Sequence, residues 1–125
     1  MEFLVVDDSR PARNLIKTYV AEVKLGEPCY FLEAGDSDTA LDLLNNRRVD
    51  FALLDWNLST NTTGLDILKT IRNSDKLKKL PVIMISGESD KQHVIESVKN
   101  GANDFATKPI DKKVFAEKIL KALGR

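Results

Sequence analysis

Five side chains suited to phosphate chemistry are spread along this sequence of 125 residues. They are two adjacent carboxylates, a third carboxylate, a hydroxyl and an amine, namely Asp7, Asp8, Asp55, Ser86 and Lys108. Two carboxylates about 4 Å apart repel by about 4 kcal/mol at an effective dielectric constant near 20, so a shared site needs positive charge. Mg²⁺, which prefers oxygen ligands, and Lys108 would together balance three carboxylates. Because an aspartate can accept a phosphoryl group whose oxygens Ser86 and Lys108 would hold, we predict phosphoryl transfer to Asp55.

Each of these residues ends or follows an apolar run typical of a short strand. The runs are FLVV at 3–6, CYFLEA at 29–34, FALL at 51–54, PVIMIS at 81–86 and DFAT at 104–107. Segments with helical spacing of apolar residues alternate with them. Strands that alternate with helices, and that are apolar almost throughout, predict a parallel sheet covered on both faces. Right-handed connections bring the carboxyl ends of all strands to one edge, where ligands bind in such folds.

Composition and charge narrow the class of protein. The sequence has 19 basic and 19 acidic residues and therefore no net charge that would attract nucleic acid or anionic lipid. A single cysteine, Cys29, suits a reducing compartment. The first residues form neither a signal peptide nor a membrane-spanning segment. We expect one domain over residues 1–125, located in the cytoplasm, with no membrane insertion and no direct binding of nucleic acid.

Five motifs carry a resemblance to a known family. The motifs DDSRPAR, LLDWN, GLDILKTIR, PVIMISGE and GANDFATKP together resemble those of two-component response-regulator receiver domains, specifically the stand-alone chemotaxis (CheY-like) type. The resemblance covers essentially the whole chain. It implies an α/β flavodoxin-like fold, with a five-stranded parallel doubly wound sheet of order 2-1-3-4-5 flanked by five helices. It also implies a signalling switch, not an enzyme, that receives its phosphoryl group from a histidine kinase and loses it by autodephosphorylation.

The resemblance assigns roles to the residues at the predicted site. It makes Asp55 the phosphoacceptor and an Mg²⁺ ligand, Asp8 a direct Mg²⁺ ligand, Asp7 a water-mediated ligand, and the backbone carbonyl of Asn57 a further ligand. Ser86 and Lys108 would bind the phosphoryl oxygens, and the peptide bond between Lys108 and Pro109 would be cis.

By the same resemblance, Phe105, Asn57 and Glu88 would govern the response to phosphorylation. Phe105 occupies the aromatic switch position, and an inward movement of Ser86 would open space for its ring. The surface of the fourth helix, fifth strand and fifth helix would then change, and a protein target would bind there. Asn57 and Glu88 lie where family members tune the lifetime of the acyl phosphate, which we expect to be short.

Two parts of the sequence need separate comment. The loop after Asp55 lacks the usual proline and reaches its glycine, Gly64, one residue late. Its polar residues Ser59 to Thr63 should therefore be exposed and more mobile than a loop braced by proline. His93 is expected on the surface of the fourth helix.

Alternative functions are a receiver excised from a larger regulator with a DNA-binding or enzymatic output, and a receiver used only for interaction. The 125 residues leave the first alternative open, whereas the complete Asp, Ser and Lys set argues against the interaction-only alternative. A phosphatase of the haloacid-dehalogenase type is disfavoured because Ser9 and Arg10, not aspartates, lie two residues after Asp7 and Asp8.

Overall fold

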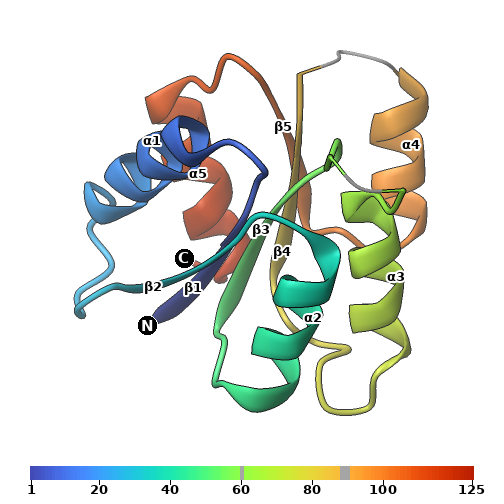
Figure 1. Ribbon diagram of the computed structural model, residues 1–125. Helices are drawn as coiled ribbons and strands as arrows, with labels where there is room; N and C mark the ends of the chain where they lie inside the picture. The colour runs from blue at the N-terminus through green and yellow to red at the C-terminus, as the bar shows by residue number, and fades with distance from the viewer. Residues whose placement is uncertain (60, 88–90) are drawn as a thin grey trace.

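Five parallel strands form one sheet between two layers of helices in the computed structural model (Figure 1), which describes residues 1–59, 61–87 and 91–125. The elements are β1 (Glu2–Val6), α1 (Arg10–Ala21), β2 (Tyr30–Ala34), α2 (Ser37–Asn46), β3 (Phe51–Asp55), α3 (Gly64–Asn73), β4 (Val82–Ser86), α4 (Lys91–Lys99), β5 (Asp104–Thr107) and α5 (Lys112–Ala122). The strand order β2-β1-β3-β4-β5 confirms the predicted topology.

The central strand β3 shows why its sequence is apolar throughout. All five of its residues are buried, because α1 and α5 cover one face of the sheet and α2, α3 and α4 lie on the other (Figure 1). Phe51 and Leu53 pack into the core beneath α1 and α5, whereas Ala52 and Leu54 pack into the core beneath α2 and α3. Alternate side chains of a strand point to opposite faces, so a strand buried on both faces needs apolar residues at every position.

The predicted helix boundaries have clear local causes. The Ser9 hydroxyl accepts a hydrogen bond from the backbone N–H of Ala12 and caps α1, with Pro11 in the first turn. The carboxylates of Asp36 and Asp111 cap α2 and α5 in the same way. Gly101 follows α4 with φ of +91°, a conformation that favours glycine.

Helix α4 differs from an ordinary amphipathic helix. Its apolar residues Val94, Ile95 and Val98 are 38%, 54% and 64% exposed, whereas the polar Ser97 is completely buried. The apolar spacing therefore predicted the helix correctly, but these side chains face away from the core. No helix in the described part of the chain is both long and apolar enough to cross a membrane.

Candidate functional site

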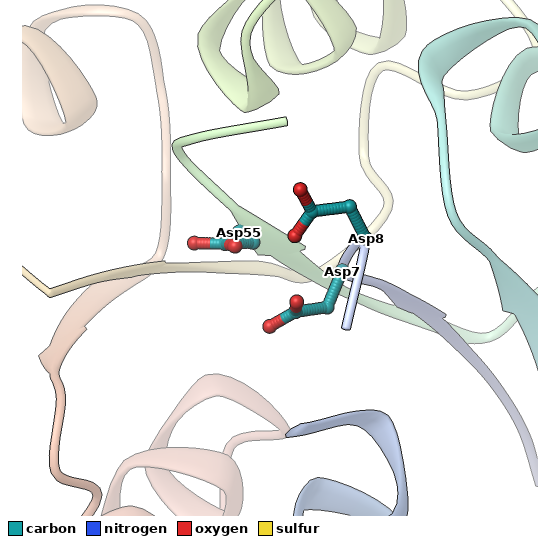
Figure 2. Close-up of side chains that lie close together, drawn as sticks. All are labelled: Asp7, Asp8 and Asp55. Atoms are coloured by element: carbon teal, nitrogen blue, oxygen red, sulfur yellow. The ribbon is translucent and has the colours of Figure 1, made fainter. Parts of the chain in front are cut away.

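The carboxyl ends of β1 and β3 bring three carboxylates together. Figure 2 shows Asp7 and Asp8 just after β1 and Asp55 at the end of β3, with their side chains directed toward a common space. One carboxylate oxygen from each residue lies within 4.8 Å of the others. Asp7 and Asp55 are buried and Asp8 is exposed. This confirms the prediction that Asp55 lies close to Asp7 and Asp8, from which it is distant in sequence.

Lys108 is the cation that the site required. Its ammonium donates to Asp7 Oδ2 at 2.9 Å and to Asp55 Oδ2 at 3.3 Å. Burial alone would lower the pKa of Lys108, but its hydrogen bond to Asp7 and the negative charges of Asp55 and Asp7 outweigh burial and raise it. The ammonium therefore stays protonated beside the two carboxylates. The Lys108–Pro109 peptide bond, which follows β5, is cis.

The environment of Asp55 disfavours its ionised form. Burial, followed by the charge of Asp7, raises its pKa from 3.8 to about 6, against the opposing effects of Lys108 and a backbone hydrogen bond from Asn57. Near neutral pH the group is still mostly ionised, as a nucleophile must be. Strongly perturbed acids in a polar crevice are typical of functional sites.

Asp7 is held by backbone as well as by charge. Its Oδ1 accepts from the backbone N–H of Ser9 at 2.9 Å, and its own N–H donates to the carbonyl of Ala34 in β2 at 3.0 Å. Arg13 donates to the Asp7 carbonyl at 2.6 Å. The buried carboxylate is therefore fixed in position before any ligand binds.

The three carboxylates fit a hard divalent cation. They offer only oxygen ligands, one of them exposed, which suits Mg²⁺ because this ion retains several waters. Asn57 follows Trp56 at the same edge and is exposed, so its backbone can approach the group of carboxylates. Residues 7, 8, 55 and 57 could together hold the ion.

Gly64 explains how the lengthened loop remains compatible with the site. A Cβ at this position would lie 2.1 Å from the carbonyl oxygen of Asp55 and 3.2 Å from Met84 Cε. Its N–H also donates to the carbonyl of Trp56 at 2.9 Å. Close approach to β3 therefore demands glycine here, so the glycine nine residues after Asp55 packs directly against β3.

The rest of this loop is less exposed than its composition suggested. Thr62 and Thr63 are half-buried, and Thr62 Oγ1 shares a hydrogen bond of 2.5 Å with Ser37 Oγ in α2. Asp66 accepts from the backbone N–H of Thr63 at 2.9 Å. Ser59 and Asn61 are exposed as predicted, and Thr60 lies outside the described residues. The prediction of a fully exposed loop was wrong because polar side chains here pair with α2 and α3.

Ser86 and Phe105 lie on the neighbouring strands. Ser86 ends β4 and is completely buried, and its backbone carbonyl accepts from the Lys108 N–H at 2.8 Å. Phe105 on β5 is only 7% exposed and packs into the core beneath α2 and α3. The predicted tuning residue Glu88 lies outside the described residues.

Two contacts were not predicted. The His93 ring is half-buried and stacks on Trp56, so its prediction as a surface residue was wrong. Lys118 in α5 donates to the carbonyl of Phe105 at 2.5 Å and to the Asp104 carboxylate at 3.2 Å. The hydrophobic pattern of α4 gave no signal that His93 turns inward, because its apolar residues Val94, Ile95 and Val98 are the exposed ones.

Comparisons with known proteins agree with this geometry. The sequence profile described as response regulator receiver domain matches residues 3–120. The chain belongs to this family. It is 35% identical over 125 residues to the chemotaxis protein CheY of Pseudomonas aeruginosa, covering 100% of this chain and 98% of that protein. It is 37% identical to a chemotaxis protein CheY homolog of Campylobacter jejuni, covering 99% and 93%.

Solved structures show the same fold. The receiver domain of NtrX from Brucella abortus superposes with a TM-score of 0.84 at 29% identity, covering 98% of both chains. The chemotaxis response regulator CheY4 of Vibrio cholerae gives a TM-score of 0.83 at 22% identity and 97% coverage of both. The chain is thus a receiver domain of the CheY type.

Proposed function

We propose that this receiver domain is a switch activated by phosphorylation of Asp55 in the presence of Mg²⁺. The observation that carries this proposal is the convergence of Asp7, Asp8 and Asp55 with the Lys108 ammonium at one edge of the sheet. A histidine kinase of a two-component system is the donor that the family membership supports. A cytoplasmic location stays a prediction.

The chemistry follows from the positions of the side chains. A carboxylate oxygen of Asp55 forms a bond to phosphorus while the P–N bond of the donor phosphohistidine breaks, and the departing imidazole nitrogen keeps the electron pair. Lys108, already beside Asp55, neutralises charge on the phosphoryl oxygens, and the Ser86 hydroxyl donates to one of them. A bound Mg²⁺ ion, held by residues 7, 8, 55 and the carbonyl of 57, would supply further charge neutralisation.

The phosphoryl group would be removed by water, without any other substrate being turned over. Asn57 is exposed beside Asp55, where its side chain can influence the approach of water. We assign the same role to Glu88 on the basis of the family pattern alone. The chain therefore acts on its own aspartate and is not an enzyme in the usual sense.

The surface formed by α4, β5 and α5 is the proposed site for a protein target. Val94 and Val98 of α4 and Val114 of α5 are exposed, and they line a groove of about 590 Å³ together with Phe105 and Ile110. Lys118 and Lys121 border the groove. Asp104 and Asp111 also line the groove, and Lys118 is paired with Asp104. An apolar floor with edges of mixed charge suits an amphipathic segment. Phe105 lines this groove and pairs with Met84 on β4, the strand that ends in Ser86; we assign it the role of aromatic switch on the basis of the family pattern.

Direct phosphorylation tests the proposal. Incubation with acetyl phosphate and Mg²⁺ should add the mass of one phosphoryl group, detected by intact-protein mass spectrometry, and the modification should disappear with hydroxylamine. Asp55→Asn should not be modified, whereas Asp75→Asn, a matched change at a fully exposed aspartate, should behave as wild type. Wild-type protein that stays unmodified would instead support a receiver used only for interaction.

A further inference from the structure

His93 connects α4 with two residues of the proposed phosphorylation site. Its imidazole stacks on the Trp56 indole, with ring centroids 4.0 Å apart and an interplanar angle of 12°. Its Nδ1 shares a hydrogen bond of 3.2 Å with Ser86 Oγ. Trp56 directly follows the phosphoacceptor, and Ser86 is the hydroxyl assigned to the phosphoryl oxygens. A single side chain on α4 therefore contacts the last residue of β4 and the residue that directly follows β3.

The position of His93 is itself fixed. Its backbone carbonyl accepts from Ser97 Oγ, which is completely buried, at 2.7 Å. Trp56 is only 8% exposed, and its backbone is held at both ends. Its backbone N–H donates to the carbonyl of Ile85 at 2.7 Å, and its carbonyl accepts from the backbone N–H of Gly64. The imidazole thus lies between two anchored segments.

A serine hydroxyl has a single hydrogen to donate and rotates freely unless a neighbour restricts it. Ser86 can serve a phosphoryl oxygen only when that hydrogen points toward Asp55. With the ring hydrogen of His93 on Nδ1, this N–H donates to Ser86 Oγ and leaves the hydroxyl hydrogen for the phosphoryl group. The contact restricts the rotation of the hydroxyl and reduces the entropy lost when it binds the phosphoryl group. Preorganisation of this kind strengthens binding without adding a contact to the ligand.

We propose that His93 is a positioning residue for the phosphoryl site: it orients the Ser86 hydroxyl and, through its stack on Trp56, ties that orientation to α4. This inference rests on the proposed function, because it assumes that Ser86 binds the phosphoryl group. It also gives α4 a direct link to the site, since Val94 and Val98 of the same helix lie on the exposed surface proposed for the target.

Two substitutions separate the two contacts of His93. His93→Phe keeps an aromatic ring for Trp56 but has no atom that can bond Ser86. His93→Asn keeps a polar atom near the position of Nδ1 but loses the stacked ring. Lys99→Ala, an exposed position at the other end of α4, is the control for general effects of substitution in this helix.

The experiment is a calorimetric titration of each variant with beryllofluoride, a mimic of the phosphoryl group, at saturating Mg²⁺, together with a titration of Mg²⁺ alone. His93→Phe should bind beryllofluoride about five- to tenfold more weakly, the usual effect of one hydrogen bond, with unchanged Mg²⁺ affinity. His93→Asn should recover most of the beryllofluoride affinity but change the fluorescence of Trp56. Lys99→Ala should match wild type in every measurement.

The outcomes distinguish this inference from the proposed function. Equal or tighter binding of beryllofluoride by His93→Phe would overturn the positioning role, as would an equal loss of Mg²⁺ affinity, which would indicate a general disturbance of the site. A wild-type protein that binds Mg²⁺ but no beryllofluoride would overturn the proposed function itself, and the role of His93 with it.

Discussion

Replacing Asp55 with asparagine should stabilise the metal-free protein near neutral pH. Burial and the charge of Asp7 raise the pKa of Asp55 from 3.8 to about 6. One pKa unit corresponds to about 1.4 kcal/mol, so keeping this group ionised in the fold costs up to about 3 kcal/mol. An uncharged asparagine of the same shape avoids that cost. Because asparagine also lacks the ion pair with Lys108, we expect a gain between about 1 and 3 kcal/mol.

The dependence on pH follows from the sign of the shift. A carboxyl whose pKa is raised in the fold binds its proton more tightly when folded than when unfolded. The wild-type protein therefore has the full contribution of this group below pH 3.8 and loses it as the pH rises through about 6. The gain from Asp55→Asn should accordingly be complete at pH 7.5, about half as large at pH 5, and lost only below pH 3.8.

Urea denaturation followed by circular dichroism measures this difference at both pH values, in EDTA and again with excess Mg²⁺. The added ion should stabilise wild type more than Asp55→Asn, because the variant has lost one of the three carboxylates. Asp75→Asn serves as the control, since its side chain is fully exposed. The electrostatic account of the site fails if Asp55→Asn is no more stable than wild type in EDTA at pH 7.5.

Three further changes test other parts of the site. Lys108→Met should destabilise the metal-free protein by roughly 1–3 kcal/mol in urea denaturation at pH 7.5, because it leaves Asp7 and Asp55 without their shared cation; a neutral effect would contradict this. Gly64→Ala should cost about 2–4 kcal/mol in the same assay, since its Cβ would clash with the Asp55 carbonyl; the gain of about 1 kcal/mol usual for Gly→Ala in a helix would show that the contact can relax. Asp8→Asn, at an exposed position, should weaken Mg²⁺ binding roughly tenfold or more in titration calorimetry. Its stability in EDTA should stay within about 0.5 kcal/mol of wild type. A variant with wild-type Mg²⁺ affinity would remove Asp8 from the proposed ligands.

The fold and the acidic centre could be predicted from sequence because both depend on features with one dominant cause. A strand such as β3 must be apolar at every position when both faces of the sheet are covered. Because β3 pairs in parallel with β1, Asp55 at its carboxyl end lies beside the residues that follow β1. Parallel pairing alone is therefore enough to bring Asp7, Asp8 and Asp55 together.

The contacts that sequence reasoning missed depend on side-chain directions that no single periodicity determines. His93 was expected on the surface because isolated histidines in amphipathic helices are usually exposed. In α4 the usual relation is inverted, with Ser97 buried and Val98 64% exposed. Only the position of the helix over β5, and not its hydrophobic pattern, decides that His93 turns toward Trp56.

This inversion of α4 has a consequence for how a receiver of this sequence can signal. A helix anchored by an extensive apolar face would resist movement, because shifting it would expose that face to water. Within the described residues, α4 instead has Ser97 as its one buried side chain, and the half-buried His93 contacts the site. Its valines and isoleucine are exposed, while His93 on its inward face contacts Ser86 and Trp56. In the proposed switch, a movement of α4 would therefore cost less free energy than a movement of α3, whose residues Ile67, Leu68 and Ile71 are fixed in the core.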